Sequence, residues 1–223
     1  MTKELFRQAV LKFTLGFILV GVLIFVPAGT LHYWNGLIFM GVLFIPMFCA
    51  GIMLMIKNPE LLRKRLNARE KQMEQNIVLK LSGLMFIVGF VVCGLDFRFG
   101  WLALSQGVVI GAVILFLLAY LMLAEVIREN TYLSRTIEIQ ENQKVIDTGL
   151  YGVVRHPMYS ATVILFLAMP LILGSLFGFI IFLTYPLIIA KRIRNEEAVL
   201  EEGLDGYREY KEKVKYRLIP FVW

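Results

Sequence analysis

The sequence has little of the charge on which soluble proteins rely. Charged residues make up 18% of its 223 residues and hydrophobic residues 58%, whereas a soluble domain holds about 25% charged and about 45–50% apolar residues. One soluble core cannot bury this much apolar surface, and the chain also lacks the polar bias of a disordered protein. The composition excludes the soluble, collagen-like and disulfide-scaffold classes and indicates an integral membrane protein.

Cysteine and histidine are also scarce, with two of each. Cys49 and Cys93 lie in apolar runs, so we interpret both as packing residues, and no Cys/His set has metal-ligand spacing. The sequence contains no P-loop, GxGxxG, H-E-x-x-H or G-x-S-x-G motif. Ionisable residues are nearly absent from the apolar runs, which argues against an ion or proton pathway and so against a transporter.

Long apolar runs are what the sequence does have. A membrane-spanning helix needs about 20 mostly apolar residues, and four runs meet this length. A fifth run, about Met158 to Ala190, is broken by Pro170 and Gly174-Ser175 and predicts a tight hairpin of two short helices. The predicted fold is an all-α membrane protein with about six spans and a helical tail from Lys191 to Pro220. The spans are Val10–Gly29, Tyr33–Ile56, Ile77–Leu95, Trp101–Ala124, Pro157–Leu173 and Ser175–Ala190.

Lys and Arg are distributed very unevenly among the connections between these spans. The two ends of the chain and the two long polar segments carry 22 of the 23, and Arg98 is the exception. Cytoplasmic loops of membrane proteins collect Lys and Arg. Both termini are therefore expected in the cytosol. The same bias explains the net charge of +6 without a nucleic-acid partner.

A first group of polar residues, Arg155-His156-Pro157-x-Tyr159, lies where a polar loop meets the fifth span. Pro157 suits the first helical turn, and the free N–H groups there favour an anion. Arg155 adds a planar donor for a carboxylate or phosphate. An interfacial anchor, with Arg155 and His156 on lipid headgroups and Tyr159 in the aromatic belt, explains these residues equally well.

A second group follows the last span. Adjacent carboxylates near a membrane are costly to desolvate unless a cation offsets them. Arg192 precedes Glu196 by one helical turn, so Glu196 can pair within the helix while Glu197 faces a ligand cation. The sequence leaves open which of the two glutamates faces a ligand. Further on, Tyr207 and Tyr210 are three residues apart and can wall a pocket or pack the tail.

The order of these groups resembles the isoprenylcysteine carboxyl methyltransferase family, which belongs with the membrane phospholipid N-methyltransferases. The resemblance covers about Glu125 to the C-terminus and divides the chain into residues 1–124 and 125–223. One departure is Ala161, where members often have glycine. The residues that carry the resemblance are Thr148-Gly149-Leu150-Tyr151, Arg155-His156-Pro157-x-Tyr159, Glu196-Glu197, Tyr207-x-x-Tyr210 and Ile219-Pro220, with Glu129-Asn130, Arg135-Thr136 and Gln140 upstream.

The resemblance implies a membrane enzyme that uses S-adenosylmethionine at the cytosolic face and takes a lipophilic acceptor from the bilayer. Arg155 and Glu197 would be catalytic, with Arg155 orienting a carboxylate and Glu196 or Glu197 holding the amino group of the cofactor. Tyrosine faces suit a sulfonium by cation–π attraction. The implied cofactor-binding residues are Gly149, Tyr151, His156, Pro157, Tyr159, Glu196, Glu197, Tyr207 and Tyr210.

The acceptor is not fixed by these residues. A carboxylate or thiolate needs no general base, whereas an ammonium does, and the motifs contain no obvious unassigned base. This favours O- or S-methylation, with an isoprenylcysteine, an isoprenoid acid, a small thiol or a lipid amine as candidates. The alternatives to a methyltransferase are a reductase-like or ligand-binding relative on a similar scaffold and a transporter or structural membrane protein.

Overall fold

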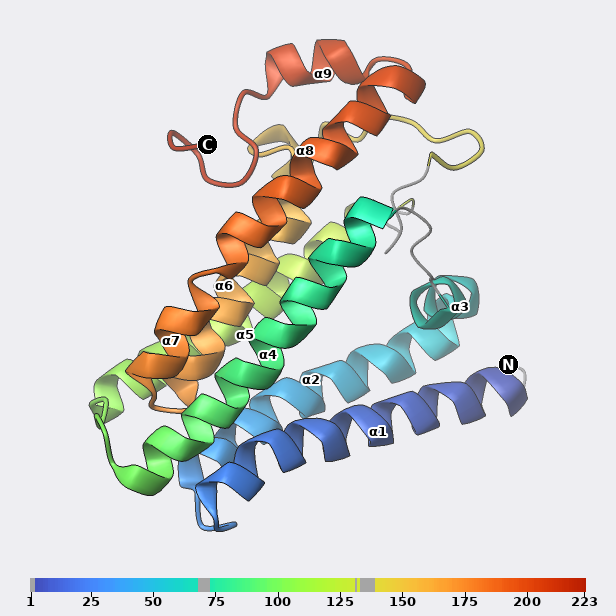
Figure 1. Cartoon of the computed structure of the whole chain (residues 1–223). Helices are drawn as coiled ribbons and strands as arrows, with labels where there is room; N and C mark the ends of the chain where they lie inside the picture. The colour runs from blue at the N-terminus through green and yellow to red at the C-terminus, as the bar shows by residue number, and fades with distance from the viewer. Residues whose placement is uncertain (1–2, 68–72, 131, 133–138) are drawn as a thin grey trace.

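The computed structural model describes residues 3–67, 73–130, 132 and 139–223 of the chain. In these residues the regular structure is entirely helical (Figure 1). A short 3-10 helix, Gly149–Gly152, precedes α6. The α-helices are α1 (Lys3–Ala28), α2 (Trp34–Lys57), α3 (Pro59–Asn67), α4 (Met73–Phe99), α5 (Gln106–Glu129), α6 (Pro157–Ile172), α7 (Leu176–Phe182), α8 (Tyr185–Gly203) and α9 (Tyr207–Lys213).

Five segments of the described chain are long and apolar enough to cross a membrane. They are α1, α2, α4, α5 and the combined segment Leu176–Gly203, whereas α6 is apolar but only 16 residues long. The predicted all-helical membrane fold is therefore confirmed, with α6 as a shorter sixth segment. Helix α3 is an addition, because no element is predicted from the sequence for the polar stretch that follows α2.

The predicted helical hairpin has its turn at the expected position, between α6 and α7. Pro157 is the first residue of α6, and its missing N–H has no helical partner to lose there. Gly174 forms the turn with φ of +77°, a conformation that side-chain-bearing residues rarely adopt. Ser175 then caps α7 by accepting a hydrogen bond from the N–H of Gly178 at 3.0 Å.

The second arm of the hairpin and the tail differ from the prediction. The arm is interrupted after Phe182, and Pro186 in the first turn of α8 restarts the helix. Helix α8 then continues past Ala190 to Gly203 and carries the polar groups out of the apolar region. The tail is helical only to Lys213, and residues 214–223 form an irregular C-terminal segment, which we call the strap.

Large aromatic side chains hold the membrane helices together. Phe39 of α2, Phe90 of α4, Phe116 of α5 and Phe182 of α7 are all buried. The ring centroids of Phe90 lie 5.6 Å from Phe39 and 5.7 Å from Phe182. In a bilayer such contacts stabilise by close packing rather than by removal from water. Together with Phe116, whose ring centroid lies 6.3 Å from that of Phe39, these contacts join α2, α4, α5 and α7 in one bundle.

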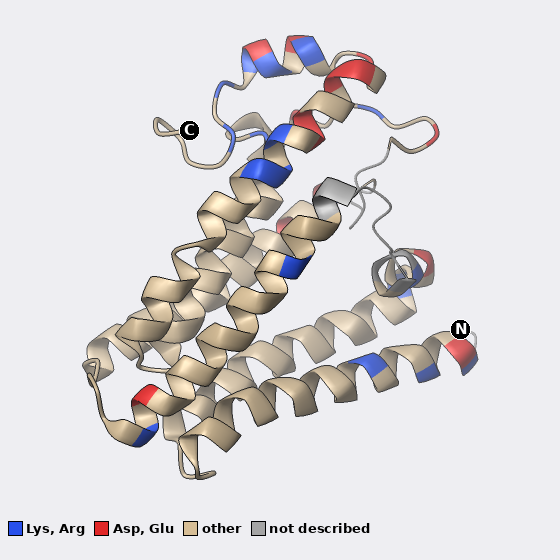
Figure 2. Ribbon diagram, in the orientation of Figure 1, with Lys and Arg blue, Asp and Glu red and all other residues tan. Residues whose placement is uncertain are grey.

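Charged residues gather at one end of the bundle. Figure 2 shows them around α3, α9 and the first part of α1, whereas the long helices are mostly free of charge. We call this the charged end; at the opposite end, α4 ends with Asp96 and Arg98. Both cysteines are free: Cys93 is buried as predicted, whereas Cys49 is exposed on α2 rather than packed.

Candidate active site

The strap runs directly against the start of α6. The N–H of Arg155 donates to the carbonyl of Tyr216 at 2.8 Å, and the N–H of His156 donates to that of Arg217 at 2.9 Å. The Ser160 hydroxyl donates to the carbonyl of Leu218 at 2.6 Å. Backbone groups that would otherwise be unpaired at the N-terminus of α6 are thus satisfied by a segment some 60 residues further along the chain.

The guanidinium of Arg155 is almost fully buried beneath the strap. Its Nε donates to Glu197 Oε1 at 2.7 Å, and its Nη1 donates to the carbonyls of Val214 and Lys215 at 2.7 and 2.9 Å. Arg155 is 7% exposed and Glu197 is 3% exposed. A buried charge is stable only when paired and hydrogen-bonded, and this pair meets both conditions.

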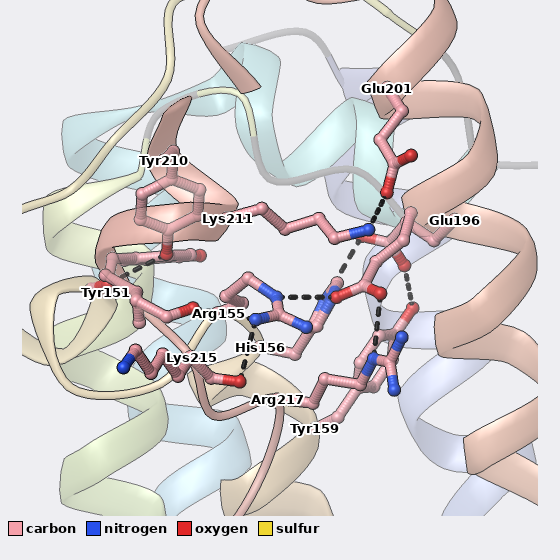
Figure 3. Close-up of polar contacts among 12 residues, drawn as sticks. Tyr151, Arg155, His156, Tyr159, Glu196, Glu201, Tyr210, Lys211, Lys215 and Arg217 are labelled. Carbon is pink, nitrogen blue, oxygen red and sulfur yellow. Dashed lines mark hydrogen bonds and ion pairs between the residues drawn. The ribbon is translucent and has the colours of Figure 1, made fainter. Parts of the chain in front are cut away.

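Glu197 is the centre of a cationic cluster. His156 Nε2 lies 3.3 Å from Glu197 Oε1, and Arg217 Nε donates to Glu197 Oε2 at 2.8 Å (Figure 3). Arg217 also places its guanidinium 5.1 Å from the ring centroid of Trp223. Glu197 therefore binds protein cations from the α6 start and from the strap.

Glu196 has quite different surroundings from its neighbour. Its Oε2 accepts a hydrogen bond from the Tyr159 hydroxyl at 2.5 Å, and Tyr159 in turn accepts one from Arg192 Nε at 2.8 Å. Its Oε1 lies 3.9 Å from His156 Nδ1. This chain of contacts leaves the Glu196 carboxylate at the wall of a cavity, with Tyr159 and Arg192 holding it in place.

That cavity lies between the start of α6, the polar part of α8, and α9. Its enclosed volume is about 100 Å³, which is smaller than a whole nucleoside, so such a ligand must part the side chains at its mouth. Seven of the residues predicted from the sequence line it: Tyr151, Arg155, His156, Tyr159, Glu196, Tyr207 and Tyr210.

The three tyrosines from outside α6 are held in different ways. Tyr151 accepts a hydrogen bond from the Asn130 side chain at 2.9 Å, and Tyr210 donates to the carbonyl of Tyr151 at 2.8 Å. The Tyr207 hydroxyl is buried without a partner in the described residues. Burial raises the pKa of Tyr151 to about 12 and raises the pKa of Tyr207 and Tyr210 above the usual range. All three hydroxyls stay protonated at neutral pH and can donate.

Three predicted residues do not belong to the described lining of the cavity. Pro157 starts α6, and Glu197 lies in the cationic cluster. Gly149 has φ of +50°, and a Cβ there would meet the Glu129 carboxylate at 2.3 Å. Gly149 and Pro157 thus shape the backbone. The sequence leaves open which glutamate faces a ligand. The structure places Glu196 at the cavity wall, bonded to Tyr159, whereas Glu197 lies among Arg155, His156 and Arg217.

Two functional residues were not identified from the sequence. Arg192 was seen only as a helical partner of Glu196, although it reaches Tyr159. Arg217 lies in the strap, and no local signal pairs it with Glu197. Of the upstream residues, Asn130 lines the cavity, and Gln140 donates a hydrogen bond to the carbonyl of Tyr132, which also lines it. Arg135 and Thr136 lie outside the described residues.

Comparison with known protein families matches residues 107–205 to the phospholipid methyltransferase family. This confirms the resemblance predicted from the sequence at the level of the family that includes the isoprenylcysteine carboxyl methyltransferases. The matched region begins in α5 and contains Arg155, His156, Tyr159 and both glutamates. The strap and the tyrosines of α9 lie beyond it.

A comparison with individual proteins gives a second similarity. The Delta(14)-sterol reductase of Mus musculus is 31% identical to this chain over 91 residues. The matched part is 40% of this chain and 22% of the reductase. The chain therefore spans only a small part of that protein's length.

Proposed function

We propose that this protein is a membrane methyltransferase that uses S-adenosylmethionine and acts on a lipophilic acceptor at the cytosolic face. The observation that carries the proposal is the cavity at the charged end, where Glu196 meets buried tyrosines and Arg155 inside the region matched to the methyltransferase family. When bound, the cofactor supplies a methyl group activated by a positively charged sulfur. The excess of Lys and Arg at this end supports its cytosolic location.

The residues at the cavity fit the charges of such a cofactor. Glu196 suits the ammonium group, because it is a carboxylate at the cavity wall that accepts a hydrogen bond from the Tyr159 hydroxyl and lies 3.9 Å from His156. The Nε and Nη1 of Arg155 donate hydrogen bonds to Glu197 and to strap carbonyls, and its Nη2 has no partner in the described part of the chain. This nitrogen is available for the cofactor's carboxylate.

The aromatic residues complete the fit. The rings of Tyr207 and Tyr210 lie 5.8 Å apart at the cavity wall and suit a cationic sulfur by cation–π attraction. The Tyr207 hydroxyl, which has no partner in the described residues, can donate to a hydroxyl or ring nitrogen of a nucleoside. Glu197 binds no ligand in this scheme; it positions Arg155 and His156.

A carboxylate acceptor, such as that of an isoprenylcysteine, agrees best with these assignments. Methyl transfer to an ionised oxygen or sulfur requires no proton removal, and catalysis then depends on alignment and exclusion of water. Met158, Leu200 and Leu204 give the cavity an apolar side for a lipophilic acceptor. A thiol or a lipid amine remains the alternative acceptor.

Calorimetry with S-adenosylhomocysteine tests the cofactor assignment. We expect micromolar binding to the detergent-purified protein and at least tenfold weaker binding to the Glu196→Gln variant. Glu201→Gln is the matched control, since Glu201 lies on the same helix and pairs with Lys211 rather than lining the cavity. Equal binding by wild type and Glu196→Gln would refute the assignment of Glu196.

A reductase is the second candidate function, and the similarity to the mouse sterol reductase favours it. A reductase must bind a reduced nicotinamide nucleotide. Heat released on titration with NADPH, with none on titration with S-adenosylhomocysteine, would replace the methyltransferase proposal with this one.

A further inference from the structure

A second cavity lies at the opposite end of the bundle, away from the candidate active site. It has a volume of about 220 Å³ and is enclosed by the α1–α2 loop, the end of α4, the α4–α5 loop and the α6–α7 turn. Its polar and aromatic lining includes His32, Tyr33, Trp34, Asn35, Asp96 and Phe97. Neither the family match nor the proposed function assigns it a role.

The wall of this cavity contains a buried carboxylate. Asp96 is 3% exposed. Its Oδ1 accepts from the N–H of Leu102 at 3.1 Å and its Oδ2 accepts from the Ser175 hydroxyl at 2.5 Å. Both donors are neutral, and no ion pair joins Asp96 to a cation of the described residues. A carboxylate can accept about four hydrogen bonds, so Asp96 keeps acceptor capacity toward the cavity.

The nearest basic residue in the sequence does not neutralise this carboxylate. Arg98 lies over the ring of Phe99, 5.7 Å from its centroid, and beside Gly29. Burial of a charge without a countercharge is costly. In a membrane protein such a residue marks a functional site by default. An ionised Asp96 would attract a cation from outside the described residues.

The remaining walls suit an organic cation. Phe97 stacks on Tyr33 with ring centroids 4.1 Å apart, and Phe97 is still 42% exposed. Trp34 is 70% exposed beside them. Aromatic faces next to a carboxylate attract substituted ammonium groups. A hard metal ion prefers several oxygen ligands, and the described residues contain no group of three or more potential metal ligands here.

We propose that this cavity binds an organic ammonium group, either the headgroup amine of a choline or ethanolamine phospholipid or a free amine of the same chemistry. The rim supports the lipid source. Leu31, Phe99 and Trp101 are exposed around the cavity, and aromatic and apolar residues of this kind anchor proteins at the level of the headgroups.

Fluorescence of Trp34 tests the proposal. In a Trp101→Phe, Trp223→Phe background, Trp34 is the remaining tryptophan, and the purified protein is titrated with choline and with 3,3-dimethylbutan-1-ol, its neutral analogue. We expect a saturable change of Trp34 emission with choline and none with the alcohol. Equal responses to the two compounds would overturn the proposal.

Two variants locate the site. Asp96→Asn keeps an acceptor for Leu102 but removes the charge, and we expect at least tenfold weaker choline binding. Asp147→Asn, at the charged end, should bind choline as the parent does. If Asp96→Asn is not monodisperse, Phe97→Leu serves as the test variant, because it leaves both hydrogen bonds of Asp96 in place. Unchanged choline affinity in Phe97→Leu would also refute the proposal.

Membrane composition separates the two sources of the amine. In phosphatidylglycerol nanodiscs, added choline should produce a saturable change of Trp34 emission. In phosphatidylcholine nanodiscs the headgroup already fills the cavity, so added choline should produce no change. If added choline changes Trp34 emission in both membranes, the ligand is a free amine instead. If it changes the emission in neither membrane, the proposal is overturned.

Discussion

At the scale of single residues, Glu196 and Glu197 are neighbours in the chain that face in different directions. Successive residues of an α-helix are about 100° apart around its axis. Glu196 therefore meets Tyr159 at the cavity, while Glu197 meets Arg155, His156 and the strap. Glu196 thus lines the cavity, whereas Glu197 neutralises Arg155 and Arg217.

Replacement of Glu197 by glutamine should destabilise the protein. The change leaves Arg155 buried without its counterion, and breaking a buried ion pair from one side costs on the order of 3 kcal/mol. We expect a clear fall in the midpoint of thermal unfolding in detergent. Glu202→Gln, on the exposed surface of the same helix, should leave the midpoint nearly unchanged. A midpoint for Glu197→Gln equal to that of Glu202→Gln would contradict the structural role of Glu197.

Tyr207→Phe should separate stability from ligand binding. The hydroxyl is buried without a described partner, and an unsatisfied buried group costs about 1–3 kcal/mol, so its removal should raise stability by about 1 kcal/mol. Loss of one hydrogen bond to the cofactor should weaken S-adenosylhomocysteine binding about fivefold. Tyr210→Phe is the comparison, since it loses a bond to Tyr151 and should be less stable. Unchanged affinity in Tyr207→Phe would remove Tyr207 from the cofactor site.

The residue types of the site were predictable, whereas their partners were not. Arg155, Tyr159 and Glu196 stand out because ionisable and aromatic residues are grouped at the membrane edge. The pairing of Arg155 with Glu197, however, joins positions 42 residues apart. Arg217 carries no helical spacing or motif that relates it to either residue. Such contacts are determined by the path of the strap, which no local pattern encodes.

At the scale of elements, α8 links the apolar region to the candidate site. Pro186 begins this helix within the apolar part, and the same helix carries Arg192 and both glutamates beyond it. Hydropathy predicted the end of the apolar segment near Ala190, because apolar composition stops there. The sequence predicts a helical tail from Lys191, but hydropathy does not show that this tail continues the apolar helix without a break, since a charged, solvated helix has no hydropathy signal.

Close contact between α1 and α4 depends on Gly94. A Cβ at this position would lie 2.5 Å from the carbonyl oxygen of Ile24, and overpacking of this kind costs about 1–3 kcal/mol. We expect Gly94→Ala to lower the midpoint of thermal unfolding in detergent. Gly83→Ala on the same helix meets no atom within 4 Å and should be neutral or slightly stabilising. Equal midpoints for the two variants would show that α1 and α4 are not in close contact at Gly94.

At the scale of the whole molecule, the two cavities lie at opposite ends of the helices, so the orientation in the membrane decides which compartment each one faces. The distribution of Lys and Arg predicts that the charged end is cytosolic. In a Cys49→Ala, Cys93→Ala background, a membrane-impermeant maleimide added to intact cells should label Leu31→Cys and not Asp205→Cys. Both positions are exposed. The reverse pattern of labelling would place the candidate active site outside the cell.

The strap has a consequence for biosynthesis. All apolar segments precede residue 191, so the ribosome makes every one of them before it makes the strap. Arg155 obtains its carbonyl partners from Val214 and Lys215, and Ser160 obtains its partner from Leu218. The charged cluster therefore assembles only after translation has passed residue 218. A chain that stopped before residue 214 would hold every apolar segment and still lack these partners of Arg155 and Ser160.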